Sequence, residues 1–200
     1  MSTIATRQRS RGAAAQTASP AGYDPVLKSV HWATVALIAG MLATVWLAHS
    51  ATSRGQHEQL IELHRSLGLA VLGLSLFRLG WRWRARVPRL PADLPRLQAA
   101  GARAVHAMLY ALLILQPLLG LVHSNAHGVR VSFFGLLTLP ALVARDKWLA
   151  KQALAAHEAV ATVLLVVIGL HAAAALFHHF VRRDDVLLSM LPRRRPNAKE

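Results

Sequence analysis

The stretch His157–His179, HEAVATVLLVVIGLHAAAALFHH, is almost entirely apolar and yet carries four histidines. Between Glu158 and Arg182 the chain runs through 23 residues without a charged side chain. A helix needs about 20 predominantly apolar residues to cross a bilayer core. The stretch therefore predicts a membrane-spanning helix. Its imidazoles require an explanation, because polar groups inside a membrane are costly and usually mark a functional site.

Two further uncharged windows have the length of a membrane span, with 25 residues between Lys28 and Arg54 and 26 between Arg103 and Arg130. A fourth candidate has a shorter uncharged centre of 12 residues, but its terminal arginines and glutamate can snorkel and two tryptophans supply an interfacial anchor. We therefore predict an all-α, integral membrane four-helix bundle. Its helices cover about 25–48, 60–83, 99–123 and 149–181, with a kink at Pro117 in the third.

The net charge of +14 does not indicate a nucleic-acid partner, because the basic residues flank the apolar spans. With four spans, 17 of the 23 Lys and Arg residues fall on one side. The positive-inside rule then places both termini in the cytoplasm. On the other side, the polar loop 50–59 precedes the second helix. The segment 124–148 is expected to lie along the outer interface as a short amphipathic piece.

The domain organisation is simple. Residues 1–22 are polar, show no apolar period and predict a disordered cytoplasmic tail. Residues 23–192 form the transmembrane domain, and 193–200 form a basic cytoplasmic tail. The chain has no cysteine, which excludes covalent C-x-x-C-H haem attachment, thiolate ligation, cysteine-bound iron–sulfur clusters and disulfides.

The spacing of two histidines predicts two separate sites. His157 and His171 are fourteen residues apart, which in a helix is roughly 21 Å of rise and about 40° short of four full turns. They share a face, near opposite sides of the bilayer. Depth pairs His31 of the first helix with His171, and His64 of the second helix with His157.

Two imidazoles from different helices at one depth can hold a haem iron from both axial sides. Such an iron has no open position for a substrate, which suits electron transfer. Zinc is a weaker fit because it takes four ligands, and the only acidic residues within the spans are Glu62 and Glu158. The motifs HEQLI and HEAVA also lack the second histidine of H-E-x-x-H.

Seven motifs carry a family resemblance. They are SVHW (29–32), ELHRSLG (62–68), FRLGWR (77–82), HAMLYALLILQPLLG (106–120), SFFGLLTLP (132–140), AHEAVA (156–161) and GLHAAAALFHHFVRRDDVLLSMLP (169–192). From Tyr23 to Pro192 the chain resembles the bacterial cytochrome b561 family of four-helix, di-haem membrane proteins. The resemblance implies two b haems with His31, His64, His157 and His171 as axial ligands to the iron.

The resemblance also implies a function. Family members pass electrons between haems and the quinone pool, and one kind is a superoxide:ubiquinone oxidoreductase. Superoxide would reach the haem of His64 and His157, drawn by cations of the outer side, which are Arg65, Arg130, Arg145, Lys147 and Lys151. Arg78 and Lys28 are expected to contact haem propionates. The resemblance implies a location in the bacterial inner membrane. A quinone region is expected at His178, with His106 and Tyr110 behind it.

Two alternatives stay open. The chain resembles an electron carrier, but it could be a cytochrome b anchor subunit that takes electrons from a docked dehydrogenase or hydrogenase. A histidine-based transporter or sensor for metal ions or protons belongs to a different class. The sparse acidic residues and the fourteen-residue histidine spacing argue against the second alternative.

Overall fold

The computed structural model describes residues 23–85 and 95–191, and long helices make up most of this part of the chain. They are α2 (Pro25–His49), α3 (Arg54–Arg82), α4 (Arg96–Ala126) and α5 (Lys147–Phe177), with α5 continuing into the π-helical turn η1 (His178–Arg182). All four are long and apolar enough to cross a membrane. The predicted all-α membrane bundle is confirmed. Both predicted tails lie outside the described residues.

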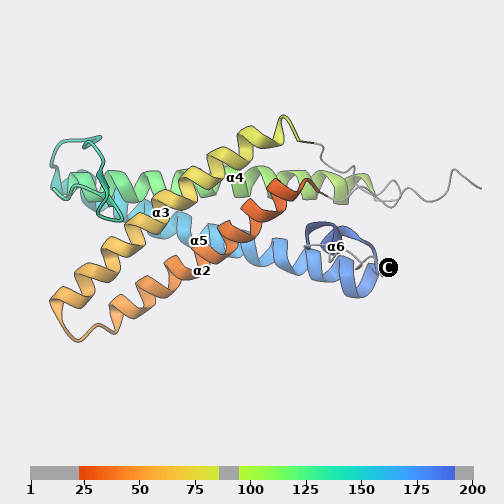
Figure 1. Cartoon of the computed structure of the whole chain (residues 1–200), viewed down its shortest axis with the longest axis horizontal. Coiled ribbons are helices and arrows are strands. Elements are labelled where there is room, and N and C mark those ends of the chain that lie inside the picture. The colour runs from red at the N-terminus through yellow and green to blue at the C-terminus, as the bar shows by residue number, and fades with distance from the viewer. Residues whose placement is uncertain (1–22, 86–94, 192–200) are drawn as a thin grey trace, which may run out of the picture.

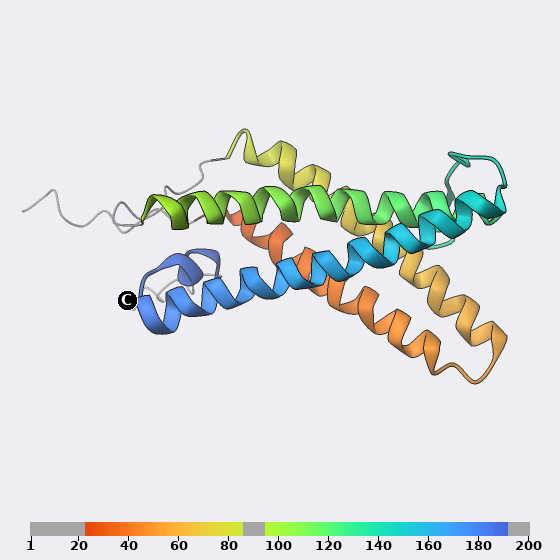
Figure 2. The same ribbon diagram turned by 180° about the vertical axis from the view of Figure 1, so that it is seen from behind.

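The helices form two antiparallel hairpins, α2 with α3 and α4 with α5, which cross each other in an X (Figures 1 and 2). We call the end where α2 begins and α5 finishes the inner end, and the opposite one the outer end. Where the hairpins cross, Val71, Leu113 and Leu164 form an apolar cluster. Leu164 lies seven residues from both His157 and His171, so this cluster separates the two predicted sites.

Two threonines of α2 are buried between the helices, and the hydroxyl group of each bonds to a carbonyl of the same helix. Thr34 donates to the Val30 carbonyl at 2.7 Å, and Thr44 donates to the Met41 carbonyl at 2.7 Å. A hydroxyl bonded within its own helix leaves no unpaired donor in the membrane, and the small side chain lets neighbouring helices approach.

The second helix begins earlier than predicted, so the expected loop over 50–59 is wrong. Ser53 caps α3 by accepting the Gln56 N–H at 3.2 Å, and Arg54 pairs with Glu58 at 2.8 Å. These polar first turns carry no apolar pattern. The most apolar window of α3 still has the lowest mean hydropathy of the four spans, 1.5 against 1.7 to 2.4.

The expected amphipathic piece after α4 is instead a small hairpin of β1 (Ser132–Phe133) and β2 (Leu137–Thr138). Its turn places Phe134 at φ 51° and Gly135 at φ 72°, in the left-handed region. Ser66 of α3 holds the hairpin, since its hydroxyl donates to the Ser132 carbonyl at 3.1 Å and accepts the Phe134 N–H at 3.0 Å.

A last short helix, α6 (Val186–Met190), folds back beside η1 and the end of α5 and is hydrogen-bonded to the first turns of α2. The Trp32 indole N–H donates to the Met190 carbonyl at 2.9 Å, and the Lys28 ammonium donates to the Leu191 carbonyl at 3.3 Å. The C-terminal segment therefore covers part of the inner end.

Asp24 joins two helices at the inner end. Its Oδ1 accepts the backbone N–H groups of Val26 and Leu27 at 2.9 and 3.2 Å and the Trp81 indole N–H at 3.1 Å. We expect Asp24→Ala to lower the free energy of unfolding by about 1–2 kcal/mol, because it removes a helix cap and orphans a donor. Thermal melts in detergent would measure this. Asp24→Asn keeps an acceptor oxygen and should stay near wild type; equal melting of both variants would contradict the prediction.

Candidate functional site

Four histidines from three helices meet in two pairs. At the inner end, His31 of α2 and His171 of α5 have ring centroids 6.3 Å apart, with an interplanar angle of 75°. At the outer end, His64 of α3 and His157 of α5 are also 6.3 Å apart, at 76°. We call these the inner pair and the outer pair. The structure thus brings together the histidines that we paired by their expected depth in the membrane.

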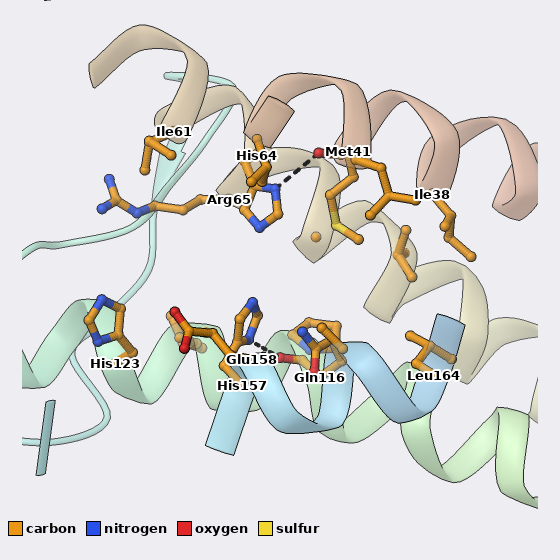
Figure 3. A pocket seen from close by; sticks show the side chains of 18 of the residues that line it. Ile38, Met41, Ile61, His64, Arg65, Gln116, His123, His157, Glu158 and Leu164 are labelled. Atoms are coloured by element: carbon orange, nitrogen blue, oxygen red, sulfur yellow. Dashed lines mark hydrogen bonds between the residues drawn. The ribbon is translucent and has the colours of Figure 1, made fainter. Parts of the chain in front are cut away.

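Backbone carbonyls orient the outer pair (Figure 3). Nδ1 of His64 lies 3.2 Å from the Met41 carbonyl, and Nδ1 of His157 lies 3.0 Å from the Gln116 carbonyl. A carbonyl can only accept, so each Nδ1 carries the proton. The Nε2 lone pair of each ring is then left for a metal, which is the usual arrangement of a metal-binding histidine.

A cavity of about 560 Å³ opens around the outer pair, within the size range of small-molecule and cofactor sites. Its lining is mostly apolar, from α2, α3, α4 and α5, and includes two glycines, Gly68 and Gly120. Such a cavity suits a large, flat, apolar ligand gripped at its centre by imidazoles.

The separation within each pair fits one iron held between the rings. With Fe–N bonds of about 2 Å and ring centres about 1 Å behind the ligating nitrogens, two axial imidazoles have centroids roughly 6 Å apart. Both pairs measure 6.3 Å. The four histidines therefore fit two b haems. The described residues contain no cluster of three or more His, Asp or Glu side chains that could hold a bare metal ion.

Other polar side chains surround the inner pair. The ring centroids of His106 in α4 and His171 are 5.2 Å apart. Nδ1 of His106 lies 2.7 Å from the Ala102 carbonyl. The Arg78 guanidinium lies 5.6 Å from the centre of the Tyr110 ring. Arg78 Nε and the Tyr110 hydroxyl are buried without a hydrogen-bond partner in the described chain. Both could therefore bind an acceptor oxygen of a ligand beside the inner pair.

Two predicted site residues are engaged elsewhere. Lys28 donates to Leu191 of the C-terminal segment, with two of its ammonium protons remaining. His178 is directed to Asp184, with Nδ1 2.6 Å from the carboxylate Oδ2. Their roles toward propionates and quinone stay predictions.

The outer cations divide into two kinds. Arg130, Arg145, Lys147 and Lys151 are exposed around the loop between α4 and α5, whereas Arg65 is half-buried and lines the cavity. The prediction from sequence gave all five cations the same role, because the exposure of a side chain cannot be read from its residue type.

The contact between Asp184 and His178 at the inner end should be sensitive to acid. Burial alone would raise its pKa, but the hydrogen bond from His178, the Val186 N–H and the charge of nearby Arg182 together lower the pKa below its usual value near 4. The stabilisation is therefore present above about pH 4 and disappears as pH falls through the lowered pKa. We expect Asp184→Asn to flatten this acid limb of stability. Melting curves from pH 3 to 7 would test it, with Asp185→Asn as the control that keeps the wild-type profile.

Sequence comparisons cover all four helices. A family profile described as prokaryotic cytochrome b561 matches residues 22–193. Cytochrome b561 homolog 2 of Escherichia coli (strain K12) is 33% identical over 177 residues, 88% of this chain and 94% of the relative. Probable superoxide oxidase CybB of Yersinia pestis is 30% identical over 173 residues, 86% and 97% of the two chains. Cytochrome b562 of Cereibacter sphaeroides is 29% identical over 181 residues, 85% and 95%.

Proposed function

The chain belongs to the prokaryotic cytochrome b561 family, and we propose that it is a di-haem cytochrome that passes electrons across the membrane to quinone. The family and the four apolar helices show that the chain is a multi-pass membrane cytochrome b in electron transport. In our proposal the inner pair binds one b haem and the outer pair binds the other.

One observation carries this proposal: two imidazole pairs of equal separation lie at the two ends of the same helix, α5. Each bound haem would supply a one-electron carrier with both axial positions closed. The chain holds the two carriers at fixed depths through His157 and His171. Val71, Leu113 and Leu164 fill the space between the sites and exclude water from it.

Superoxide is the proposed donor at the outer end. Support comes from the likeness to the Yersinia pestis protein, whose name is probable superoxide oxidase. The four exposed cations Arg130, Arg145, Lys147 and Lys151 would raise the local concentration of a small anion. The rate of reduction should then fall as salt rises, because exposed charges are screened over about 10 Å at 0.1 M ionic strength.

The proposed quinone region lies at the inner end. Quinone reduction consumes protons, and His106 and Tyr110 are titratable groups beside the inner pair. His178 adds a third such group near the end of α5. The excess of Lys and Arg on this side supports a cytoplasmic location of both termini.

The test uses the purified chain in detergent. We expect b-haem Soret and α bands in the purified protein. We also expect rapid haem reduction by a pulse of potassium superoxide and reduction of an added short-chain ubiquinone, and superoxide dismutase should abolish these two reductions. Absence of the bands would overturn the proposal. Bands without superoxide reduction, together with a copurifying dehydrogenase or hydrogenase that reduces them, would establish the anchor-subunit alternative. A metal transporter has no support in the described residues, which lack a cluster of three or more metal-binding side chains.

A further inference from the structure

We propose that Arg65 binds a carboxylate of the haem held by the outer pair, so that it is a cofactor-binding residue rather than one of the cations that draw in an anion. This inference rests on the proposed function and extends it to the outer site. Arg65 follows His64 directly in α3, and both line the same cavity.

The guanidinium of Arg65 lacks a partner. No hydrogen-bond acceptor or ion pair for it is present in the described chain, whereas Arg54, about three helical turns earlier, pairs with Glu58 at 2.8 Å. The charge that acts on it is that of Glu62, which is exposed to the surroundings. A half-buried guanidinium is costly unless an anion and its hydrogen bonds compensate for lost water. An anion bound beside Arg65 would supply this compensation.

The composition of the cavity narrows the identity of this anion. Arg65 is the one Lys or Arg among the residues that line it, and Glu158, which is exposed, is the one carboxylate. In Figure 3 the Arg65 guanidinium lies to the side of the imidazole pair, toward the loop end of the cavity, where His123 and Glu158 are also found. A haem gripped at its iron would extend its edge to this end.

Haem carries two propionate groups on one edge, and burying them unpaired in a membrane is costly. The planar guanidinium can receive one of them through two parallel N–H···O bonds. Both Arg65 and the carboxylate group would be satisfied by this single contact.

The residue that precedes the β1–β2 hairpin forms part of the cavity wall near Arg65. Ser66, the next residue, holds the hairpin through its two hydrogen bonds to Ser132 and Phe134, and buried Val131 lines the cavity. A wall that excludes water strengthens a charge pair. Three consecutive residues, His64, Arg65 and Ser66, would then hold the iron, the carboxylate and the covering loop.

The experiment compares Arg65→Gln and Arg65→Lys with Arg130→Gln, a matched control at an exposed arginine of the same end. In the holoprotein we measure the midpoint potential of each haem and the rate of haem transfer to excess apomyoglobin. We expect Arg65→Gln to release the outer haem roughly tenfold faster, because a charge-assisted hydrogen bond is lost, and to lower its potential, because a nearby positive charge favours the reduced form. Arg65→Lys should lie between, and Arg130→Gln should match wild type.

Three outcomes would overturn the inference. Arg65→Gln could match Arg130→Gln in both measurements. It could slow only reduction by superoxide and leave haem release and potential unchanged, which would make Arg65 a steering residue. It could affect the inner haem alone. If wild type itself holds fewer than two haems, the proposed function fails, and this result is distinguishable because it appears before any Arg65 variant is made.

Discussion

Alanine in place of His64 or His157 should leave one b haem per chain instead of the two proposed for wild type, and the haem that remains should be the inner one. The reason is geometric, because we propose that each pair supplies both axial ligands, and its rings are 6.3 Å apart. Removing one imidazole leaves an iron with a single protein ligand in an apolar cavity. Replacing His31 or His171 should remove the inner haem in the same way. Haem per chain, measured as the pyridine haemochrome, and a two-component redox titration would report which haem is lost.

The control is His127→Ala, which changes an exposed histidine of the same outer end that does not line the cavity. It should retain two haems and wild-type potentials. For the ligand positions, His157→Gly with added imidazole separates ligation from folding, since free imidazole can refill the vacated axial position. Restoration of the outer haem by imidazole is the expected result. Two haems in a folded His64→Ala or His157→Ala protein would show that the outer pair does not hold the iron.

Much of the fold could be predicted because the membrane imposes length and hydropathy on each helix. The pairing of His31 with His171 could be predicted from two facts alone, the rise per residue of a helix and the side of the membrane on which each helix begins. The first turns of α3 were missed because polar helical residues outside the apolar core carry no hydropathy signal. A signal was present, since Ser53 followed by Gln56 has the spacing of a capping box.

The supporting contacts of the site could not be predicted in the same way. The acceptors for His64 and His157 are the backbone carbonyls of Met41 and Gln116, and a carbonyl belongs to every residue. The sequence therefore cannot mark which carbonyl faces an imidazole. The half-buried state of Arg65 was missed for a related reason, because burial depends on how the two hairpins cross.

Gly120→Ala should weaken the outer site although it changes no ligand. A Cβ at Gly120 would lie 3.0 Å from Cε1 and 3.3 Å from Nδ1 of His157. The first distance is at the limit that real Cβ atoms respect, so the imidazole ring must move. That movement pulls Nδ1 away from the Gln116 carbonyl, now at 3.0 Å, and rotates Nε2 off the position that faces His64. Loss of such an orienting contact costs roughly 10- to 100-fold in metal affinity.

We therefore expect Gly120→Ala to release the outer haem at least tenfold faster than wild type, with the inner haem unchanged. Gly169→Ala is the matched control, because a Cβ there meets nothing within 4 Å, although Gly169 lies only two residues from His171. Both substitutions place alanine in a helix, which alanine favours, so helix propensity cannot explain a difference. Equal haem release by the two variants would mean that the His157 ring does not lie against Gly120 in the haem-bound protein.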